Sequence, residues 1–249
     1  MEDFGKYDLR SLKKICVGGA PSTPELVKSI YQKLGCKVHN GFGSVEGTCA
    51  ATRPDDSIET ICHSVGKPIC PYDTLKIVDP EGRELPPNKE GELVSKGPGV
   101  FTGYFKSAED NQRVFTKDGF FRTGDLAKKD EREYIYITGR IKDIIIRGGE
   151  NISAIDIENL ISAHPGIQSV AVVGMPDKIL GERICAYVQP RSGVTLTFEG
   201  IISFLKGRGA SVLQLPERIE FVESIPLTNI GKPDKKVLRE DIQKRLGPV

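Results

Sequence analysis

Three consecutive isoleucines, residues 144–146, stand between a charged turn and a double glycine in the stretch ITGRIKDIIIRGGENIS, residues 137–153. Isoleucine is branched at Cβ and favours extended backbone, so these residues predict a short apolar strand. The glycines that follow predict backbone that bends sharply or lies close against something. The chain must therefore place a stiff strand directly before a turn that carries no side chains.

The pattern of the sequence changes near this stretch. Before it, runs such as TLKIVD and ELVSKG alternate with turns such as PEGRELPPNKEG, which predicts small antiparallel strands in a compact sheet or barrel. After about residue 140, helices and strands mix without strict alternation, which favours an α+β fold over a parallel doubly wound sheet. We expect one domain at residues 1–139, a hinge at 140–143 and a smaller mobile α+β domain at 144–249.

The first part of the chain predicts a strand and a helix. Residues 8–18 indicate a helical turn that leads into a buried strand. Pro24 is typical of a helix start and Gly35 of a helix stop. Between them, one helix face is expected to carry the apolar side chains of Leu26, Val27, Ile30 and Tyr31.

Composition excludes several classes of protein. The 249 residues are 38% hydrophobic and 28% charged, as in globular proteins with a core, and the net charge of +1 gives no overall attraction to nucleic acid. No apolar run approaches the roughly 20 residues of a membrane span. The N-terminus lacks a signal-peptide pattern, so a cytoplasmic location is expected. The six cysteines and three histidines have no metal-ligand spacing, which argues against a zinc site.

Two motifs carry residues suited to a sugar. Asp125, in FRTGDL, either stabilises a loop or accepts hydrogen bonds from both hydroxyls of a ribose, because its two oxygens match a diol. Arg140, which follows a glycine, is either a surface charge or a forked donor to sugar or phosphate oxygens.

Two glycine-rich motifs carry residues suited to a nucleotide. In NGFGSVEG, Glu46 is either a solvated acid beside a packed Phe42, or an oxygen ligand for Mg²⁺ with Phe42 stacked on a flat ring. Gly18 and Gly19, in GGAP, either form a turn or let backbone lie against a planar ligand.

Lys232, in PLTNIGKPDKK, lies between a glycine and a proline. Its ammonium group is either a solvated cation or a positioned charge that offsets charge developing on a carboxylate or phosphate. The chain has no Walker-type spacing and no other Ser/Thr/Gly-rich phosphate loop. It therefore lacks the segment that would hold a triphosphate.

The order of these pieces is specific. GGAP, FGSVEG, GELVSKGPGVFTGYF, GFFRTGDL, GRIKDIIIRGGENIS and PLTNIGKPDKK follow one another as in the adenylate-forming superfamily. From about residue 8 to 245 the chain resembles the C-terminal half of these acyl- and aryl-CoA synthetases, peptide-synthetase adenylation domains and luciferases. The resemblance implies the end of the large adenylation domain followed by a small cap domain. We expect Met1 to begin a truncated chain, the second half of a split gene or a short divergent protein, inactive alone.

The resemblance implies an AMP-forming acid–thiol ligase. Such an enzyme converts a carboxylic acid and ATP, with Mg²⁺, into an acyl-adenylate, and a thiol then displaces AMP. The residues implied to bind the nucleotide are Gly18, Gly19, Ala20, Phe42, Gly43, Asp125 and Arg140, with Glu46 as the metal ligand. Lys232 is implied to assist adenylation and Lys142 to be the hinge. Gly149 is implied to lie beside the pantetheine tunnel, although Gly148 and Gly149 could simply form a hairpin turn.

Some alternatives remain open. Val45 stands where the superfamily usually has threonine, which resembles the aryl-acid ligases such as 2,3-dihydroxybenzoate-activating enzymes, as do TRPDDSIE and GMPDKILGER. The acid is either an aryl acid or a fatty acid, and the acceptor is either coenzyme A or the phosphopantetheine of a carrier protein. The chain could instead be a non-catalytic binding module, or one chain of a two-chain ligase. The last alternative predicts a large apolar surface on residues 1–138.

Overall fold

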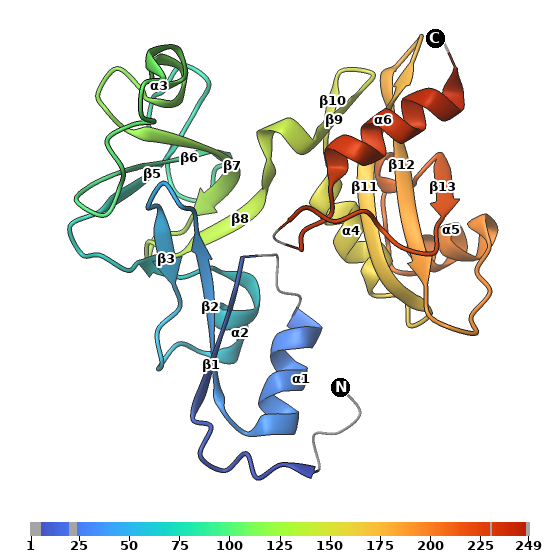
Figure 1. Ribbon diagram of the computed structural model, residues 1–249, viewed down its shortest axis with the longest axis horizontal. Helices are drawn as coiled ribbons and strands as arrows, with labels where there is room; N and C mark the ends of the chain where they lie inside the picture. Colours follow the sequence, from blue (N-terminus) through green and yellow to red (C-terminus); the bar gives the residue numbers. More distant parts are fainter. Residues whose placement is uncertain (1–5, 20–23, 230, 248–249) are drawn as a thin grey trace. The chain divides into compact units, whose positions relative to one another are not determined.

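The computed structural model describes residues 6–19, 24–229 and 231–247, and its elements form two compact units (Figure 1). The first unit is Met1–Ile137 and the second is Thr138–Val249. Helices mix with largely antiparallel sheets, so the predicted α+β class is confirmed. The boundary between the compact units lies before Thr138, and the domain bounds 1–139 and 144–249 stay a prediction. The Ser153 hydroxyl donates to the Thr138 carbonyl at 3.0 Å.

The first unit contains two sheets. The strands of its first sheet are, in spatial order, β1 (Lys14–Gly18), β2 (Lys37–Gly43), β3 (Cys49–Ala51) and β4 (Lys67–Pro68). β1 and β2 are parallel and the other pairs are antiparallel. Helices α1 (Pro24–Leu34) and α2 (Ile58–His63) pack on β2 through a small core of Val27, Val38, Ile61 and Cys62.

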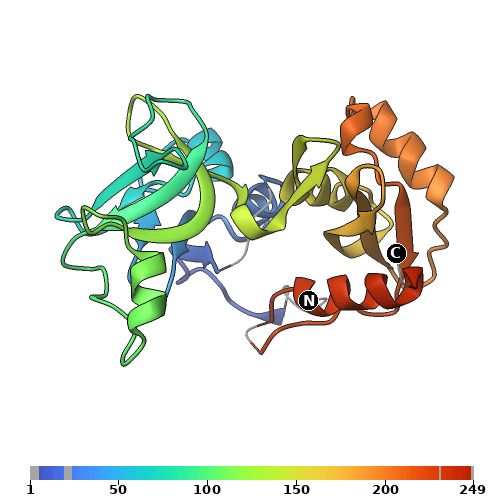
Figure 2. The same ribbon diagram turned by 90° about the horizontal axis from the view of Figure 1, so that it is seen from above.

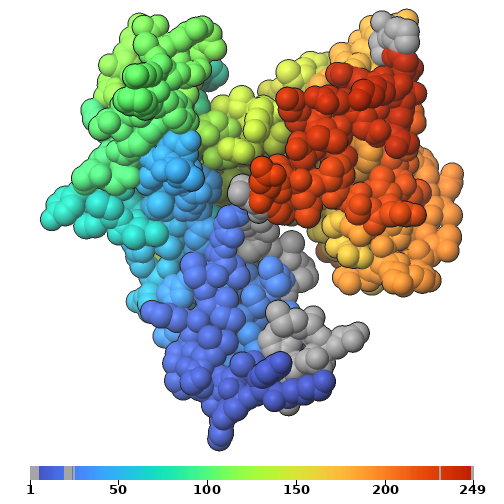
Figure 3. Space-filling model, viewed as in Figure 1, coloured from blue at the N-terminus to red at the C-terminus, as the bar shows by residue number. Residues whose placement is uncertain are grey.

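β1 forms where the sequence predicts a strand, but the prediction that it is buried was wrong. Its residues are exposed or half-buried, and they lie at the surface of the first unit, dark blue in Figure 3. The reason is its position, because among the described residues β1 is an edge strand that pairs with β2 alone.

Helix α1 begins at Pro24 and ends before Gly35, as predicted. Gly35 has a φ of +60°, a conformation that suits glycine at the end of a helix. The residues of the predicted apolar face differ in exposure. Val27 is fully buried, whereas Leu26 and Tyr31 are 47% and 41% exposed.

The second sheet of the first unit is open. Its strands are, in order, β5 (Thr74–Val78), β6 (Gly91–Lys96), β7 (Phe121–Lys129) and β8 (Ile135–Arg140), with α3 (Ala108–Val114) in the connection before β7. The last three residues of β8 belong to the second unit. The described strands form a sheet rather than a closed barrel. A shared core joins the two sheets, because Ala50 of β3 packs in one cluster with Leu75, Ile77, Leu93, Ala127 and Ile135.

The second unit is one sheet covered by helices. Its elements are the 3-10 turn η2 (Ile141–Asp143), β9 (Ile144–Arg147), β10 (Glu150–Ser153), α4 (Ala154–Ser162), β11 (Ile167–Asp177), β12 (Gly181–Pro190), α5 (Phe198–Gly207), η3 (Val212–Gln214), β13 (Arg218–Phe221) and α6 (Lys235–Leu246). The strand order is β10-β9-β12-β11, and β13 pairs in parallel with β12.

Alternation along β11 and β12 separates two cores. Val172, Ile184 and Ala186 face the core that contains α4 and α5. Val173 and Tyr187 face the core that contains α6. Neighbouring side chains on a strand point to opposite faces, so each strand serves both cores. Figure 2 shows α6 in red on one side of this sheet and the other two helices on the opposite side.

The larger core of the second unit can be tested at Ile161, which is fully buried in α4. We expect Ile161→Ala to lower the free energy of unfolding by about 2–5 kcal/mol, because it removes apolar contact and leaves a cavity. The control is Ile179→Ala, whose side chain is 86% exposed; we expect a change within about 0.5 kcal/mol. Urea unfolding measures both, and equal losses would contradict this core.

Candidate active site

The glycine pair at the end of β1 is required by strand pairing. Gly18 is the register partner of Gly41 on β2, and a Cβ on Gly18 would lie 2.8 Å from the Gly41 carbonyl oxygen. Gly19 follows with a φ of +81°, a left-handed conformation that favours glycine. Ala20 lies outside the described residues. The contact with adenine remains a prediction for all three.

Phe42 has a structural role on β2. It pairs with Ala50 and is partly buried against the cluster that contains Leu93 and Ala127. Gly43 ends the strand, where a Cβ would lie 3.2 Å from the sulfur of Cys49. The sequence left open whether Phe42 packs or stacks on a ligand. The packing is present, and stacking by its remaining surface stays a prediction.

Glu46 lies on a short loop whose position is fixed by residues 97–104. The Tyr104 hydroxyl donates to Glu46 Oε1 at 2.8 Å, and the Phe101 N–H donates to the Glu46 carbonyl at 2.8 Å. A Cβ on Gly47 would lie only 1.9 Å from the carbonyl oxygen of Gly99, so the two loops touch backbone to backbone. This loop therefore presents the Glu46 carboxylate from a defined place.

Tyr104 is a site residue that the sequence did not predict. Its hydrogen bond to Glu46 raises the pKa of the phenol, because ionisation would place two negative charges together. The phenol therefore stays a donor over the ordinary pH range. The sequence signal was available, because Tyr104 belongs to the quoted motif GELVSKGPGVFTGYF, but no role was drawn from it.

Asp125 is buried on a bulge of β7. The register runs from Val94↔Arg122 to Glu92↔Leu126, so Thr123, Gly124 and Asp125 all lie opposite Leu93. The Thr123 hydroxyl donates to the Leu93 carbonyl at 2.8 Å and accepts from the Asp125 N–H at 3.0 Å. Gly124 has a φ of +71°, which a bulge of this kind uses to turn the strand.

Glu92 holds this bulge from the neighbouring strand. It accepts from the Gly124 N–H at 3.3 Å and from the Arg122 guanidinium at 2.7 Å. Its side chain is only 9% exposed and that of Arg122 is 31% exposed, so water screens this ion pair less than one between fully exposed side chains. Glu92 is a second residue that the sequence analysis missed.

Arg140 is the last residue of β8, and Lys142 lies in the turn η2 that follows. Both residues are exposed. The segment after them is attached to α6. Arg239 donates to the Lys142 carbonyl at 3.0 Å and to Asp143 at 2.6 Å. The hinge at residues 140–143 stays a prediction. The contacts of Arg239 attach the C-terminal end of this segment to α6.

The double glycine forms a hairpin turn between β9 and β10. Arg147 and Glu150 are paired, so Gly148 and Gly149 alone make the turn, with φ values of +59° and +90°. This is the two-residue turn that positive φ angles allow. The hairpin turn that the sequence left open as an alternative is therefore present. No described atom lies within 4 Å of a Cβ built on Gly149, so that face is open. The pantetheine tunnel stays a prediction.

Lys232 is exposed on a closed loop before α6. The Thr228 N–H donates to the Lys232 carbonyl at 2.7 Å, and the Lys232 N–H donates to the Thr228 hydroxyl at 3.2 Å. Leu227 and Pro233 form a bridge at its base. Asp234 then caps α6. The backbone of Lys232 is thus constrained, as the sequence predicts, while its side chain extends into solvent.

The structure groups the predicted residues in two sets. One set lies in the first unit and comprises Gly18, Gly19, Phe42, Gly43, Glu46 and Asp125; the other lies in the second unit and comprises Arg140, Lys142, Gly149 and Lys232. Within the first unit, the hydrogen bond between Thr48 and Ser95 joins the Glu46 loop to β6, which also borders the Asp125 bulge.

The described residues contain no group of three or more His, Cys, Asp or Glu side chains that could hold a metal ion. A Mg²⁺ ion needs no such group, because one or two carboxylates and the phosphates of a substrate commonly hold it. Glu46 fits that arrangement. In the same part of the chain, every helix is too short or too polar to cross a membrane.

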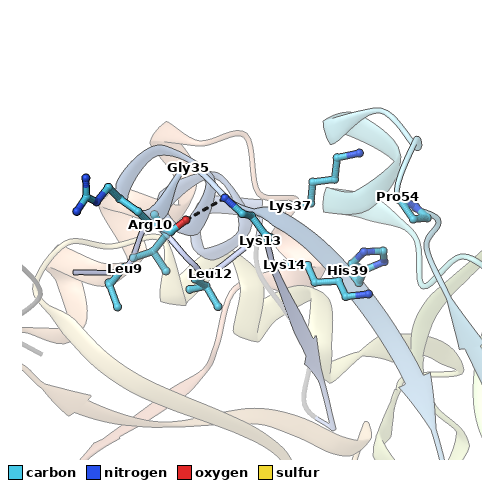
Figure 4. A pocket seen from close by; sticks show the side chains of 10 residues that line it. Leu9, Arg10, Leu12, Lys13, Lys14, Gly35, Lys37, His39 and Pro54 are labelled. Atoms are coloured by element: carbon cyan, nitrogen blue, oxygen red, sulfur yellow. Dashed lines mark hydrogen bonds between the residues drawn. The ribbon is translucent and has the colours of Figure 1, made fainter. Parts of the chain in front are cut away.

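A basic groove of about 670 Å³ lies elsewhere in the first unit (Figure 4). Arg10, Lys13, Lys14, Lys37 and His39 line it, together with leucine and proline side chains. Lys14 and Lys37 are register partners on β1 and β2, so both strands contribute a cation to the groove. None of the predicted site residues lines this groove, and nothing in the structure shows what covers it.

Comparison with known proteins decides the family. The sequence profile of AMP-binding enzymes matches residues 1–105, and that of the AMP-binding enzyme C-terminal domain matches residues 156–232. The chain belongs to the family of AMP-binding enzymes.

The relatives include enzymes named for aryl acids. The chain is 42% identical over 239 residues to the 2,3-dihydroxybenzoate-AMP ligase of Bacillus subtilis, covering 96% of the chain and 44% of the relative. It is 38% identical to the salicyl-AMP ligase / salicyl-S-ArCP synthetase of Mycobacterium tuberculosis, covering 96% and 42%. The chain thus spans less than half the length of these relatives.

Solved structures with a similar fold include a ligand-bound enzyme. ATP-bound MatB from Rhodopseudomonas palustris matches with a TM-score of 0.86 at 34% identity, covering 93% of the chain and 46% of MatB. The amide bond synthetase McbA from Marinactinospora thermotolerans matches with a TM-score of 0.87 at 33% identity, covering 98% and 50%.

Glu92 can be tested for its role in the bulge. We expect Glu92→Gln to destabilise the first unit by about 1–3 kcal/mol, because the Arg122 guanidinium and the Gly124 N–H lose their charged acceptor. Glu90→Gln is the control, because Glu90 is exposed on the same segment, and it should change stability by less than about 0.5 kcal/mol. Both are measured by urea unfolding. A Glu92 variant as stable as the control would show that the bulge does not depend on this carboxylate.

Proposed function

We propose that the chain is the C-terminal portion of an AMP-forming aryl-acid–thiol ligase. The supporting observation is the whole-chain match to ligases of aryl acids together with the two sets of predicted residues on rigid elements. In the first half-reaction, a carboxylate oxygen attacks the α-phosphorus of ATP and pyrophosphate leaves. In the second, a thiolate attacks the carbonyl carbon of the acyl-adenylate and AMP leaves.

In this proposal the first unit binds the adenosine part of the nucleotide. Gly18, Gly19 and Phe42 flank adenine, and the buried carboxylate of Asp125 accepts from the ribose hydroxyls. A carboxylate held by a bulge loses little freedom on binding, so it orients the sugar well. Glu46 would hold Mg²⁺, which would neutralise phosphate charge, and Tyr104 orients the Glu46 carboxylate.

The second unit supplies the groups that act on the reacting atoms. Lys232 contacts the carboxylate and phosphate oxygens during adenylation, and Arg140 adds a donor to the ribose. Lys142 is the hinge about which the second unit turns between the two half-reactions. In the second half-reaction, Gly149 lies beside the path by which the thiol enters. Its open face supports that role, because a side chain there would occupy space that the acceptor needs.

The names of the relatives favour an aryl acid and do not support fatty acid metabolism. A phosphopantetheine thiol on a carrier protein is the acceptor we propose, because one relative is named a salicyl-S-ArCP synthetase. Coenzyme A is the alternative, which another relative named a salicylyl-CoA synthase supports.

A two-chain ligase is the second candidate. It is favoured by large apolar side chains exposed on the first unit, with Val45, Tyr72 and Phe105 at 101%, 79% and 88% exposure. A contiguous patch of such side chains would mark a surface that another polypeptide covers, and these three exposed side chains are the residues from which such a patch would be built.

The proposed function predicts acid-dependent ATP–pyrophosphate exchange that requires an N-terminal half with a phosphate loop. We expect no exchange for this chain alone, and exchange with 2,3-dihydroxybenzoate or salicylate, but not with a fatty acid, when that half is fused to it. Supplying the half as a separate polypeptide tests the two-chain candidate. Absence of exchange with every acid in both arrangements would refute the ligase.

Lys232→Ala in the completed enzyme should slow adenylation by roughly 10²–10³-fold, because a positioned donor to developing charge is lost. Thioester formation from a supplied acyl-adenylate should change far less. Lys236→Ala is the control, because Lys236 is exposed on α6 nearby. Both steps are followed by single-turnover kinetics, and equal slowing of both would count against the proposed role.

A further inference from the structure

The segment between the two units is attached to the second unit at two backbone carbonyls. The Ser153 hydroxyl donates to the Thr138 carbonyl at 3.0 Å. Arg239 donates to the Lys142 carbonyl at 3.0 Å. The rotatable backbone bonds of Lys142 lie between these two attachments.

A rotation about Lys142 affects the two attachments differently. The carbonyl of Lys142 lies beyond the φ and ψ bonds of that residue, so it stays with Asp143 and the rest of the second unit when they rotate. The Arg239 attachment therefore survives such a rotation. The Thr138 carbonyl lies on the other side of the rotating bonds, so its hydrogen bond to Ser153 must break.

The surviving attachment is built from charges on α6. Arg239 contacts Asp143 at 2.6 Å, and Lys235 lies 3.8 Å from Asp143 and 2.8 Å from Glu158. Glu158 in turn accepts from the Val172 N–H of β11 at 2.7 Å. The C-terminal side of Lys142 is thus joined through α6 and α4 to the central sheet. Because α6 begins directly after the Lys232 loop, this segment and that loop turn together.

The attachment that must break can do so at little cost to the fold. Ser153 is the N-cap of α4, and its oxygen also accepts from the Asp156 N–H at 3.4 Å. A hydroxyl has one hydrogen to donate and two lone pairs to accept with, so both bonds form at once. When Thr138 departs, the cap of α4 remains and only the donated bond is lost.

We propose that Ser153 is a positioning residue that latches Thr138 to the second unit in one rotational state of Lys142 and releases it in the other. The inference rests on the proposed function for the hinge at Lys142. In the latched state the boundary of the units falls before Thr138, as observed. In the released state residues 138–141 belong with the first unit.

Ser153→Asp separates the latch from the cap. An aspartate still accepts at the N-cap, but at neutral pH it has no hydrogen for the Thr138 carbonyl and repels it. Ser153→Thr keeps both functions and is the matched control. The experiment uses the 249-residue chain itself and needs no enzymatic activity, so its result is independent of the ligase assay.

The readout is tryptic cleavage after Arg140, which lies within the latched segment, followed by mass spectrometry of the fragment that begins at Ile141. We expect Ser153→Asp to cleave about fivefold faster, which corresponds to the roughly 1 kcal/mol net contribution of one hydrogen bond. Urea unfolding of the second unit should lose no more than that same roughly 1 kcal/mol, because the cap of α4 is kept, and Ser153→Thr should behave as the original chain.

Two results would overturn the latch. One is cleavage of Ser153→Asp at the original rate. The other is faster cleavage with a loss of stability in urea well above that of one hydrogen bond, because Ser153 would then act mainly as a structural cap. If the predicted cleavage pattern is found while ATP–pyrophosphate exchange fails, the latch stands and the proposed ligase does not.

Discussion

Close contact between backbones is the constraint on which the first unit depends. Gly18 meets Gly41, Gly47 meets Gly99, and a Cβ on Gly66 would lie 1.9 Å from the Ala51 carbonyl oxygen. A side chain at any of these glycines would separate segments that are far apart in the sequence. The contact at Gly47 has a functional consequence, because it fixes the loop that presents Glu46 against the segment that carries Tyr104.

Much of the fold could be predicted from local pattern. The start and stop of α1, the strand at residues 144–147 and the turn at Gly148 and Gly149 follow from proline, β-branched residues and glycine, which act within a few residues. Exposure could not be predicted in this way. Whether β1 is buried depends on what pairs with its free edge, and no local pattern contains that information.

The residues of the candidate site also divide into those that a local pattern predicts and those that it does not. Glu46, Asp125 and Lys232 were found because each stands beside a glycine in a motif, and the structure places each on constrained backbone. Tyr104 and Glu92 were missed because their importance comes from a partner more than 30 residues away, 58 for Tyr104 with Glu46 and 32 for Glu92 with Gly124. Such partnerships are decided by tertiary contact, which one sequence does not show.

The sheet of the second unit has helices on both faces, so its central strands β11 and β12 bury apolar side chains on both sides within that unit. A domain whose hydrophobic core is formed by its own residues can keep its fold without contacts from a neighbouring domain. Such a domain can therefore be joined to a different catalytic domain during evolution. Only the few residues of the connecting segment then have to change.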